Sequence, residues 1–236
     1  RTSPFAFTGN KFEFRAVGSS ANCAISMTVL NTIMAETLKK FKTDVDALIE
    51  KGDKKEIAIM QVIQKYIVES KNVLFEGDGY SDEWHKEAER RGLPNLKTTP
   101  VALDAMVTDK AKKLFESMGV YSHTELEARH EIELEKYIKK VQIEARIMGD
   151  LAINHILPAA ISYQNDLLTN VNGLKAAGLG ESAYKSQLSI LKEVSEHIQV
   201  IHDKVNAMVE ARKVANNITD TREKAICNHR CCCLLK

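Results

Sequence analysis

Apolar residues recur at every third or fourth position over a long stretch near the end of the chain, and this spacing constrains the fold more than any other feature. The residues concerned are Tyr184, Leu188, Leu191, Val194, Ile198, Ile201, Val205 and Met208. An α-helix turns once in about 3.6 residues, so these side chains form one apolar stripe. The pattern predicts a single helix from Glu181 to about Ile218, packed against another long helix.

An earlier segment predicts the helix that pairs with it. Ser122 and Glu125 have the spacing of a capping box, which starts a helix that continues through Leu134, Tyr137, Ile138 and Val141. Pro158 lacks an amide hydrogen, so we expect a kink there. A turn follows at Gly173, Gly178 and Gly180. The two long helices are therefore expected to form an antiparallel hairpin.

The first half of the chain predicts two further helices. One has apolar residues at Met27, Leu30, Ile33, Met34, Leu38, Phe41, Val45 and Leu48 and ends near Gly52. The next runs from about Asp53 to Asn72, with Ile57, Met60, Ile63 and Ile67 in register. Between Gly77 and Pro100 the chain is polar, and we expect a loop with one short helix. Thr99 followed by Pro100 predicts another helix start.

The N-terminal segment has a different period. From Phe5 to Val17, phenylalanines alternate with charged residues around the turn-like sequence Thr8-Gly9-Asn10. A period of two is typical of a β-strand with one buried face. The predicted fold class is therefore mainly α, with a short N-terminal β-hairpin followed by a long-helix region.

The charge balance excludes several classes of partner. Lys and Arg total 33 against 32 for Asp and Glu, so the net charge is +1 and no overall field favours nucleic acid or a membrane surface. No apolar run approaches the roughly 18 residues of a membrane span. Of the five cysteines, four crowd the last ten residues, which is not the pattern of a secreted disulfide framework. We expect a reduced, cytoplasmic protein.

The charged face of the predicted hairpin could carry chemistry. Lys11, Glu13 and Arg15 alternate along one strand, so two cations flank one carboxylate at intervals of about 7 Å. Such a layout can bind a metal ion together with an anionic substrate. It is also the ordinary solvated face of an amphipathic strand. The residues alone leave both interpretations open.

A resemblance to a known family bears on that choice. The first fifteen residues read RTSPFAFTGNKFEFR. They resemble the glutamine synthetase segment that reads Asn-Arg-[Thr/Ser]-Ser and continues, after a turn, into a strand ending in x-Glu-x-Arg. The following GSSANCA is similar to the type III class. Two helical stretches also resemble that class: KLFESMGVYSHTELEARHEIELEKYIKKVQIEARIMGDL from Lys113 and NHILPAAISYQNDLL from Asn154. The likeness covers the chain from Arg1 to about Ala225.

The resemblance implies roles for individual residues. Arg1 matches the arginine that contacts the phosphates of ATP, and Glu13 matches a carboxylate ligand of Mg²⁺ or Mn²⁺. Arg15 matches the catalytic arginine near the glutamate side-chain carboxylate. Lys11 falls at an ATP-binding position where the better-known classes usually carry Arg. It keeps the positive charge but lacks the planar guanidinium group. Asn22 is expected to be the N-cap of the next helix.

The family's reaction and assembly are implied in the same way. ATP phosphorylates glutamate, and ammonia then displaces phosphate to give glutamine, in a homo-oligomer of stacked rings with active sites between subunits. On this basis, residues 1–52 end the catalytic domain, 53–225 form a helical region specific to type III, and 226–236 form an atypical Cys-rich tail. Arg1 stands inside a motif, so we expect a fragment that is inactive alone. The alternative is a non-catalytic helical module for interaction or oligomerisation.

Other candidate ligands have ordinary structural explanations. Glu127 and His130 have the Glu-x-x-His spacing of a di-iron bundle, but that motif should occur twice and occurs once, so a solvated helix face is favoured. His85, His123 and His130 are expected to be surface or capping residues. Trp84 could anchor an interface or cover a small satellite core, and the second interpretation is favoured.

The last residues differ from the rest of the chain. Cys227, Cys231, Cys232, Cys233 and His229 could bind zinc, but adjacent cysteines cannot easily present their sulfurs tetrahedrally to one ion. A reading-frame error or a truncated sequence explains the composition better. We therefore expect the helical pattern to stop before this tail.

Overall fold

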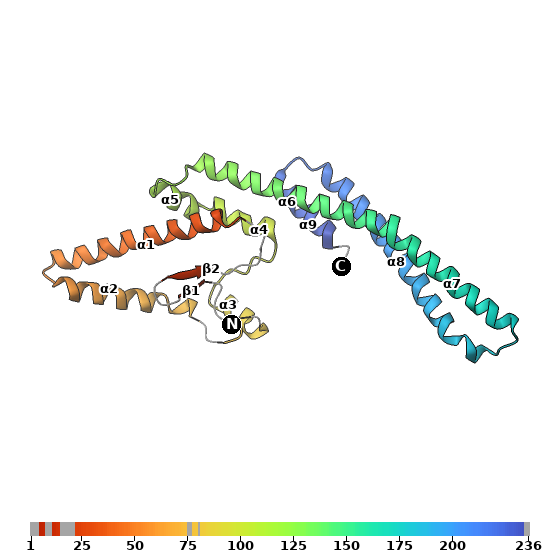
Figure 1. The fold of residues 1–236 in the computed structure, drawn as a ribbon. Coiled ribbons are helices and arrows are strands. Elements are labelled where there is room, and N and C mark those ends of the chain that lie inside the picture. Colours follow the sequence, from red (N-terminus) through yellow and green to blue (C-terminus); the bar gives the residue numbers. More distant parts are fainter. Residues whose placement is uncertain (1–4, 8–10, 15–21, 75–76, 80, 234–236) are drawn as a thin grey trace. The chain divides into compact units, whose positions relative to one another are not determined.

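Two compact units make up the chain. The computed structural model describes residues 5–7, 11–14, 22–74, 77–79 and 81–233, and at 5–7, 12–14, 232 and 233 it describes the backbone alone. One unit holds Arg1–Glu76 and Lys113–Val120, and the other holds Gly77–Lys112 and Tyr121–Lys236. Most described residues are helical (Figure 1), so the predicted mainly α class is confirmed. The units reflect packing, and the domain boundaries at 52 and 225 stay a prediction.

The N-terminal segment contains two very short strands. β1 (Phe5–Phe7) pairs antiparallel with β2 (Phe12–Phe14), and the register sets Ala6 opposite Glu13. The predicted hairpin extended to Val17, but residues 15–17 lie outside the described part of the chain. These strands are a small element, since most of the other described residues are helical.

Two helices follow in the same unit, as predicted, and they pack as a hairpin. α1 (Ala24–Glu50) and α2 (Lys55–Glu69) pack against each other and bury Val45, Ala58 and Val62. Gly52 lies in the turn between them with φ of +105°, a left-handed conformation that glycine adopts without a steric penalty. The ring of Phe41 meets the ring of Tyr66 edge to face, with 5.9 Å between centroids.

The predicted apolar face of α2 is only partly correct. Ile57, Met60 and Ile67 are exposed, while Ala58 and Val62 are the residues buried against α1. Ala58 has a small side chain, which lets the two helices approach closely at that point. Ile57, Met60 and Ile67 therefore lie away from α1, although their spacing gives a clearer helical pattern in the sequence than Ala58 and Val62 do.

Among the described residues, five short helices follow α2 in the sequence and precede the long helix that starts at His123. They are η1 (Lys71–Val73), α3 (Asp82–Arg90), α4 (Thr99–Leu103), η2 (Asp104–Val107) and α5 (Asp109–Ser117). Ser81 caps α3 by accepting a hydrogen bond from the Trp84 amide at 3.2 Å. The predicted helix start at Thr99 and Pro100 is confirmed. Trp84 is half-buried, and the Arg91 guanidinium lies 5.6 Å from its ring centroid.

α6 (His123–Leu151) starts as the sequence predicts. Ser122 Oγ accepts from the Glu125 amide at 3.3 Å, and the Ser122 amide donates to Glu125 Oε2 at 2.8 Å, so the capping box is complete. Near Pro158 the α-helix gives way to a π-helix, η3 (Ala152–Ile156), and then to α7 (Leu157–Ala176). Proline removes one helical hydrogen bond, and the wider turn accommodates that loss.

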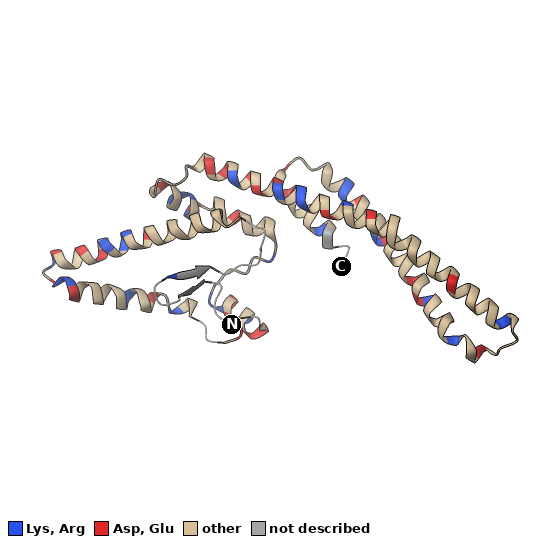
Figure 2. Cartoon of the chain, in the orientation of Figure 1, with Lys and Arg blue, Asp and Glu red and all other residues tan. Residues whose placement is uncertain are grey.

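α7 and α8 (Lys185–Asn216) form the predicted antiparallel hairpin, with η4 (Glu181–Ala183) at its tip. Gly173, expected in the turn, lies inside α7, and the turn is made at Gly178 with φ of +76°. Where α8 meets α6, the buried cluster contains Ala145, Ala152, Val205 and Met208. Charged residues are frequent on α6 and α8 but sparse on α7 (Figure 2).

The expectation that helical structure stops before the Cys-rich tail is wrong. α9 (Thr221–Cys233) continues through most of it and packs against α6. Ala225, Asn228 and Cys231 recur every third residue and are buried, which gives α9 an inward face that the unusual composition hides. Within the described ranges, no helix has both the length and the apolar character needed to cross a bilayer.

Candidate functional site

The residues implied by the resemblance lie at the edge of what the structure describes. Arg1 and Arg15 are outside the described residues, and Glu13 is described by its backbone in β2 alone. Lys11 is exposed just before β2. Their roles toward ATP, metal and glutamate therefore stay predictions.

Asn22 has the capping role that the sequence predicts, from one position earlier than expected. Its Oδ1 accepts a hydrogen bond from the Ala24 amide at 2.8 Å, while the residue at the N-cap itself is Cys23. An amide at the first turn of a helix has no partner within the helix, so this contact stabilises the start of α1.

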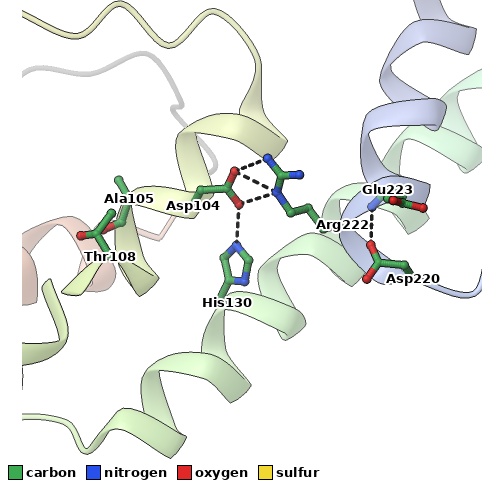
Figure 3. A network of polar contacts seen from close by, with 7 residues as sticks. All are labelled: Asp104, Ala105, Thr108, His130, Asp220, Arg222 and Glu223. Atoms are coloured by element: carbon green, nitrogen blue, oxygen red, sulfur yellow. Dashed lines mark hydrogen bonds and ion pairs between the residues drawn. The ribbon is translucent and has the colours of Figure 1, made fainter.

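A polar cluster that links three segments of the chain centres on Asp104. Figure 3 shows its carboxylate between Arg222 of α9 and His130 of α6. Arg222 Nε donates to Oδ1 at 3.0 Å and to Oδ2 at 2.9 Å, and Nη2 donates to Oδ2 at 2.7 Å. His130 Nε2 lies 3.2 Å from Oδ1. One carboxylate from η2 thus joins three segments of the chain.

The charges in this cluster compensate each other. The Arg222 hydrogen bonds hold the pKa of Asp104 below its ordinary value, with a smaller contribution from His130, and they outweigh burial. The same pair raises the pKa of the Arg222 guanidinium. The Asp104 side chain is 28% exposed, so solvent screens the pair only in part.

A polar groove of about 380 Å³ lies beside this cluster. Lys112, Glu127, His130, Asp220 and Arg222 contribute to its lining. Lys112 Nζ donates to Glu127 Oε1 at 2.6 Å, which lowers the pKa of that carboxyl. Asp220 Oδ1 accepts from the Glu223 amide at 2.7 Å and so caps α9. The first contact joins α5 to α6, and the second is local to the start of α9.

The two residues of the Glu-x-x-His match have different partners. Glu127 binds Lys112, and His130 binds Asp104. His85 and His123 are exposed, as predicted. His130 is not a surface residue, since its side chain is only 14% exposed. Across the described ranges, no group of three His, Cys, Asp or Glu side chains is placed to hold a metal ion.

Sequence reasoning missed the Asp104 cluster because its members are far apart in the chain. One local signal was available: Asp220 followed by Glu223 is a capping pattern that predicts the start of α9. No local pattern predicts that Arg222 reaches Asp104, because the partners are 118 positions apart. That pairing follows from the packing of α9 against α6.

Comparison with known proteins gives a consistent result. Residues 58–175, half of the chain, match the family model described as the glutamine synthetase C-terminal domain. A glutamine synthetase of Bacteroides fragilis is 48% identical over 95% of this chain and 31% of its own length. A type-3 glutamine synthetase of Dictyostelium discoideum is 38% identical over 92% of this chain and 30% of its own length.

A third relative matches a similar share of this chain and of its own length. The glutamine synthetase of Butyrivibrio fibrisolvens is 31% identical over 95% of this chain and 32% of its own length. The chain therefore spans about a third of the length of the curated relatives it matches. With a family model that matches half of its residues, the chain belongs to the glutamine synthetase family.

Proposed function

We propose that this chain acts as part of a glutamine synthetase, which joins ammonia to glutamate at the expense of ATP through γ-glutamyl phosphate. The observation that carries the proposal is the N-terminal string RTSPFAFTGNKFEFR, at the head of a chain that resembles named glutamine synthetases along most of its length. Residues 1–52, including the strand pair, would end the catalytic domain.

The proposed roles follow from the chemistry of the side chains. Arg1 would bind ATP phosphates, because a guanidinium forms paired hydrogen bonds with phosphate oxygens. Arg15 would hold the γ-carboxylate of glutamate close to the transferred phosphoryl group. Lys11 would add positive charge beside the phosphates without the geometric selectivity of Arg.

Glu13 would contribute a metal ligand. A carboxylate oxygen is a donor that Mg²⁺ and Mn²⁺ accept, so the residue type suits the ion. Mg²⁺ takes six ligands, and one carboxylate supplies one or two, so other groups of the assembly would complete the shell. When bound, the ion would neutralise charge that gathers during phosphoryl transfer.

Stacked-ring homo-oligomers and a cytoplasmic location belong to the same proposal, and they rest on the resemblance to the type III class. Ammonia and glutamate would be the substrates. Since a single carboxylate and three cations cannot form a complete ligase site, we expect the 236-residue chain alone to form no glutamine.

A helical interaction module is the second candidate function. It is favoured by apolar side chains that α1, α2 and α7 leave exposed, among them Met27, Met60 and Ile161. Such side chains fit a chain that associates with other protein surfaces. The two functions are compatible, because a helical region can support assembly while the N-terminal segment serves catalysis.

The test uses the polypeptide encoded by the whole gene. Glutamine formation from glutamate, ammonia and ATP is measured for the wild type and for Glu13→Gln, with Glu83→Gln on α3 as a control that removes one exposed carboxylate. We expect activity in the wild type and the control, and a loss of about 100-fold or more in Glu13→Gln. Equal activity of the two variants would contradict the role of Glu13. No activity in the wild type would favour the interaction module.

A further inference from the structure

α9 packs against α6 with small and polar side chains. Its buried residues include Ala225, Asn228 and Cys231, which are 0%, 1% and 3% exposed. On α6, Leu134 and Ile138 pack against Ala225. Hydrophobic stabilisation grows with the apolar area removed from water, and these three residues of α9 offer less of it than the two leucines and one valine that α7 buries. The apolar contribution of α9 to its own docking is therefore small.

One buried polar atom of α9 lacks a hydrogen bond. Within the described residues, Asn228 Oδ1 has no partner, although Asn228 Nδ2 donates to the Lys224 carbonyl at 2.8 Å. An acceptor that is buried without a partner raises the free energy of the docked helix, and water satisfies that acceptor when the helix undocks. Asn228 therefore shifts the balance toward an undocked α9.

Two polar contacts fasten α9, and both are partly open to water. Near the start of the helix, Arg222 binds Asp104 (Figure 3), and the Arg222 side chain is 47% exposed. Seven residues further on, His229 Nδ1 lies 2.6 Å from Tyr137 Oη, and both residues are half-buried. Seven residues make about two helical turns, so both contacts lie on one side of α9. A hydrogen bond that water can replace contributes only modest net stability.

The helices next to α9 have contacts of their own. The buried cluster between α6 and α8 consists, among the described residues, of Ala145, Ala152, Val205 and Met208, which all lie outside α9. α7 and α8 pack against each other as a hairpin. Residues 217–220 join α8 to α9. Because these contacts do not use α9, they can persist when α9 moves.

We propose that α9 is a detachable segment, which undocks from α6 as a unit while α6, α7 and α8 stay folded. Elements with few buried apolar contacts open at a lower free energy than the whole protein unfolds. Undocking uncovers Leu134 and Ile138 on α6 and gives solvent access to the Cys231 thiol. The inference rests on the packing of α9, and it does not depend on the ligase proposal.

The test uses the Cys231 thiol as a reporter, because it is 3% exposed when α9 is docked. In the 236-residue chain, Cys23, Cys227, Cys232 and Cys233 are changed to Ser. An aromatic disulfide is added, and the Cys231 thiolate attacks it, forming a mixed disulfide and releasing a coloured thiolate. We expect labelling that is slower than for an unfolded peptide and that depends weakly on urea, since opening exposes little surface. Circular dichroism under the same conditions should show a folded chain.

A variant of one polar contact makes the test specific for α9. Arg222→Gln removes the contact with Asp104, and Arg90→Gln is the matched control, since Arg90 binds Glu87 within α3. We expect the labelling rate to rise about fivefold or more in Arg222→Gln and to stay unchanged in the control. If circular dichroism shows that Arg222→Gln fails to fold, Tyr137→Phe replaces it and should raise the rate in the same way.

Three results would overturn the proposal. The first is labelling with the full urea dependence of the circular dichroism transition, because α9 would then open only when the whole chain unfolds. The second is labelling at the rate of an unfolded peptide, because α9 would then not be docked. The third is an equal labelling rate in Arg222→Gln and Arg90→Gln.

Discussion

Asp104 and Arg222 are 118 residues apart in the sequence, and their side chains meet through three hydrogen bonds of 2.7–3.0 Å. The contact attaches the first turn of α9 to η2, and His130 of α6 binds the same carboxylate. The Asp104 side chain thus links η2 to both α9 and α6.

We predict that Asp104→Asn lowers the free energy of unfolding by about 1 kcal/mol, because the substitution keeps the shape of the side chain and removes its charge. The partial exposure of Asp104 keeps the effect near the low end of the range for charged hydrogen bonds. Urea denaturation measures it, with Asp166→Asn on exposed α7 as the control. A loss no larger than that of the control would show that the pair adds nothing to stability.

The same contact should make stability depend on acid pH. The pKa of Asp104 is lowered in the folded chain, so its contribution is present above the unfolded value of about 4 and is lost as pH falls through the lowered pKa. The stability difference between wild type and Asp104→Asn should thus shrink below about pH 4. Measuring both chains in a His130→Gln background isolates the Asp104–Arg222 pair from the second partner of Asp104. A difference that stays constant down to pH 2 would contradict this assignment.

Two helical glycines should respond to substitution in opposite ways. A Cβ at Gly149 would lie 3.1 Å from Met208 Cε, whereas a Cβ at Gly173 would meet nothing within 4 Å. We predict that Gly173→Ala raises the free energy of unfolding by about 0.5–1 kcal/mol through helix propensity. Gly149→Leu should lower it by about 1–3 kcal/mol through overpacking against α8. Thermal denaturation of both variants measures the effects, and a loss of stability in Gly173→Ala would refute the first.

The contact between Tyr137 and His229 should also be measurable. Tyr137 Oη lies 2.6 Å from His229 Nδ1, and both residues are half-buried where α6 meets α9. Tyr137→Phe should cost about 1 kcal/mol, because it removes the hydroxyl and leaves the ring. Tyr163→Phe, at an exposed position on α7, is the matched control and should be nearly neutral. Equal effects in the two variants would mean that the hydrogen bond is not stabilising.

Local patterns predicted the long helices well. The Ser122 and Glu125 capping box set the start of α6, and the apolar spacing from Tyr184 to Met208 predicted α8 as one helix. Both features depend on residues within a few turns of each other, so the sequence alone contains the information. Pro158 marked the end of regular α-helix, although not the π-helix that precedes it.

Features that depend on packing were not predictable in this way. In α2, the stripe of Ile57, Met60 and Ile67 has the stronger periodicity, yet small Ala58 permits the closer approach to α1. In α9, an unusual run of cysteines hid the inward face of Ala225, Asn228 and Cys231. The proposed roles of Arg1, Glu13 and Arg15 rest on the sequence alone.

The most direct measurement follows one oxygen atom through the reaction of the whole-gene polypeptide. Glutamate labelled with ¹⁸O in its γ-carboxylate is supplied with ATP and ammonia. If ATP phosphorylates the carboxylate and ammonia then displaces phosphate, the bridging oxygen leaves with phosphorus. The account predicts one ¹⁸O in each inorganic phosphate released, in step with glutamine formation, and neither product from Glu13→Gln above about 1% of the wild-type rate. Unlabelled phosphate, or phosphate release without glutamine, would contradict it.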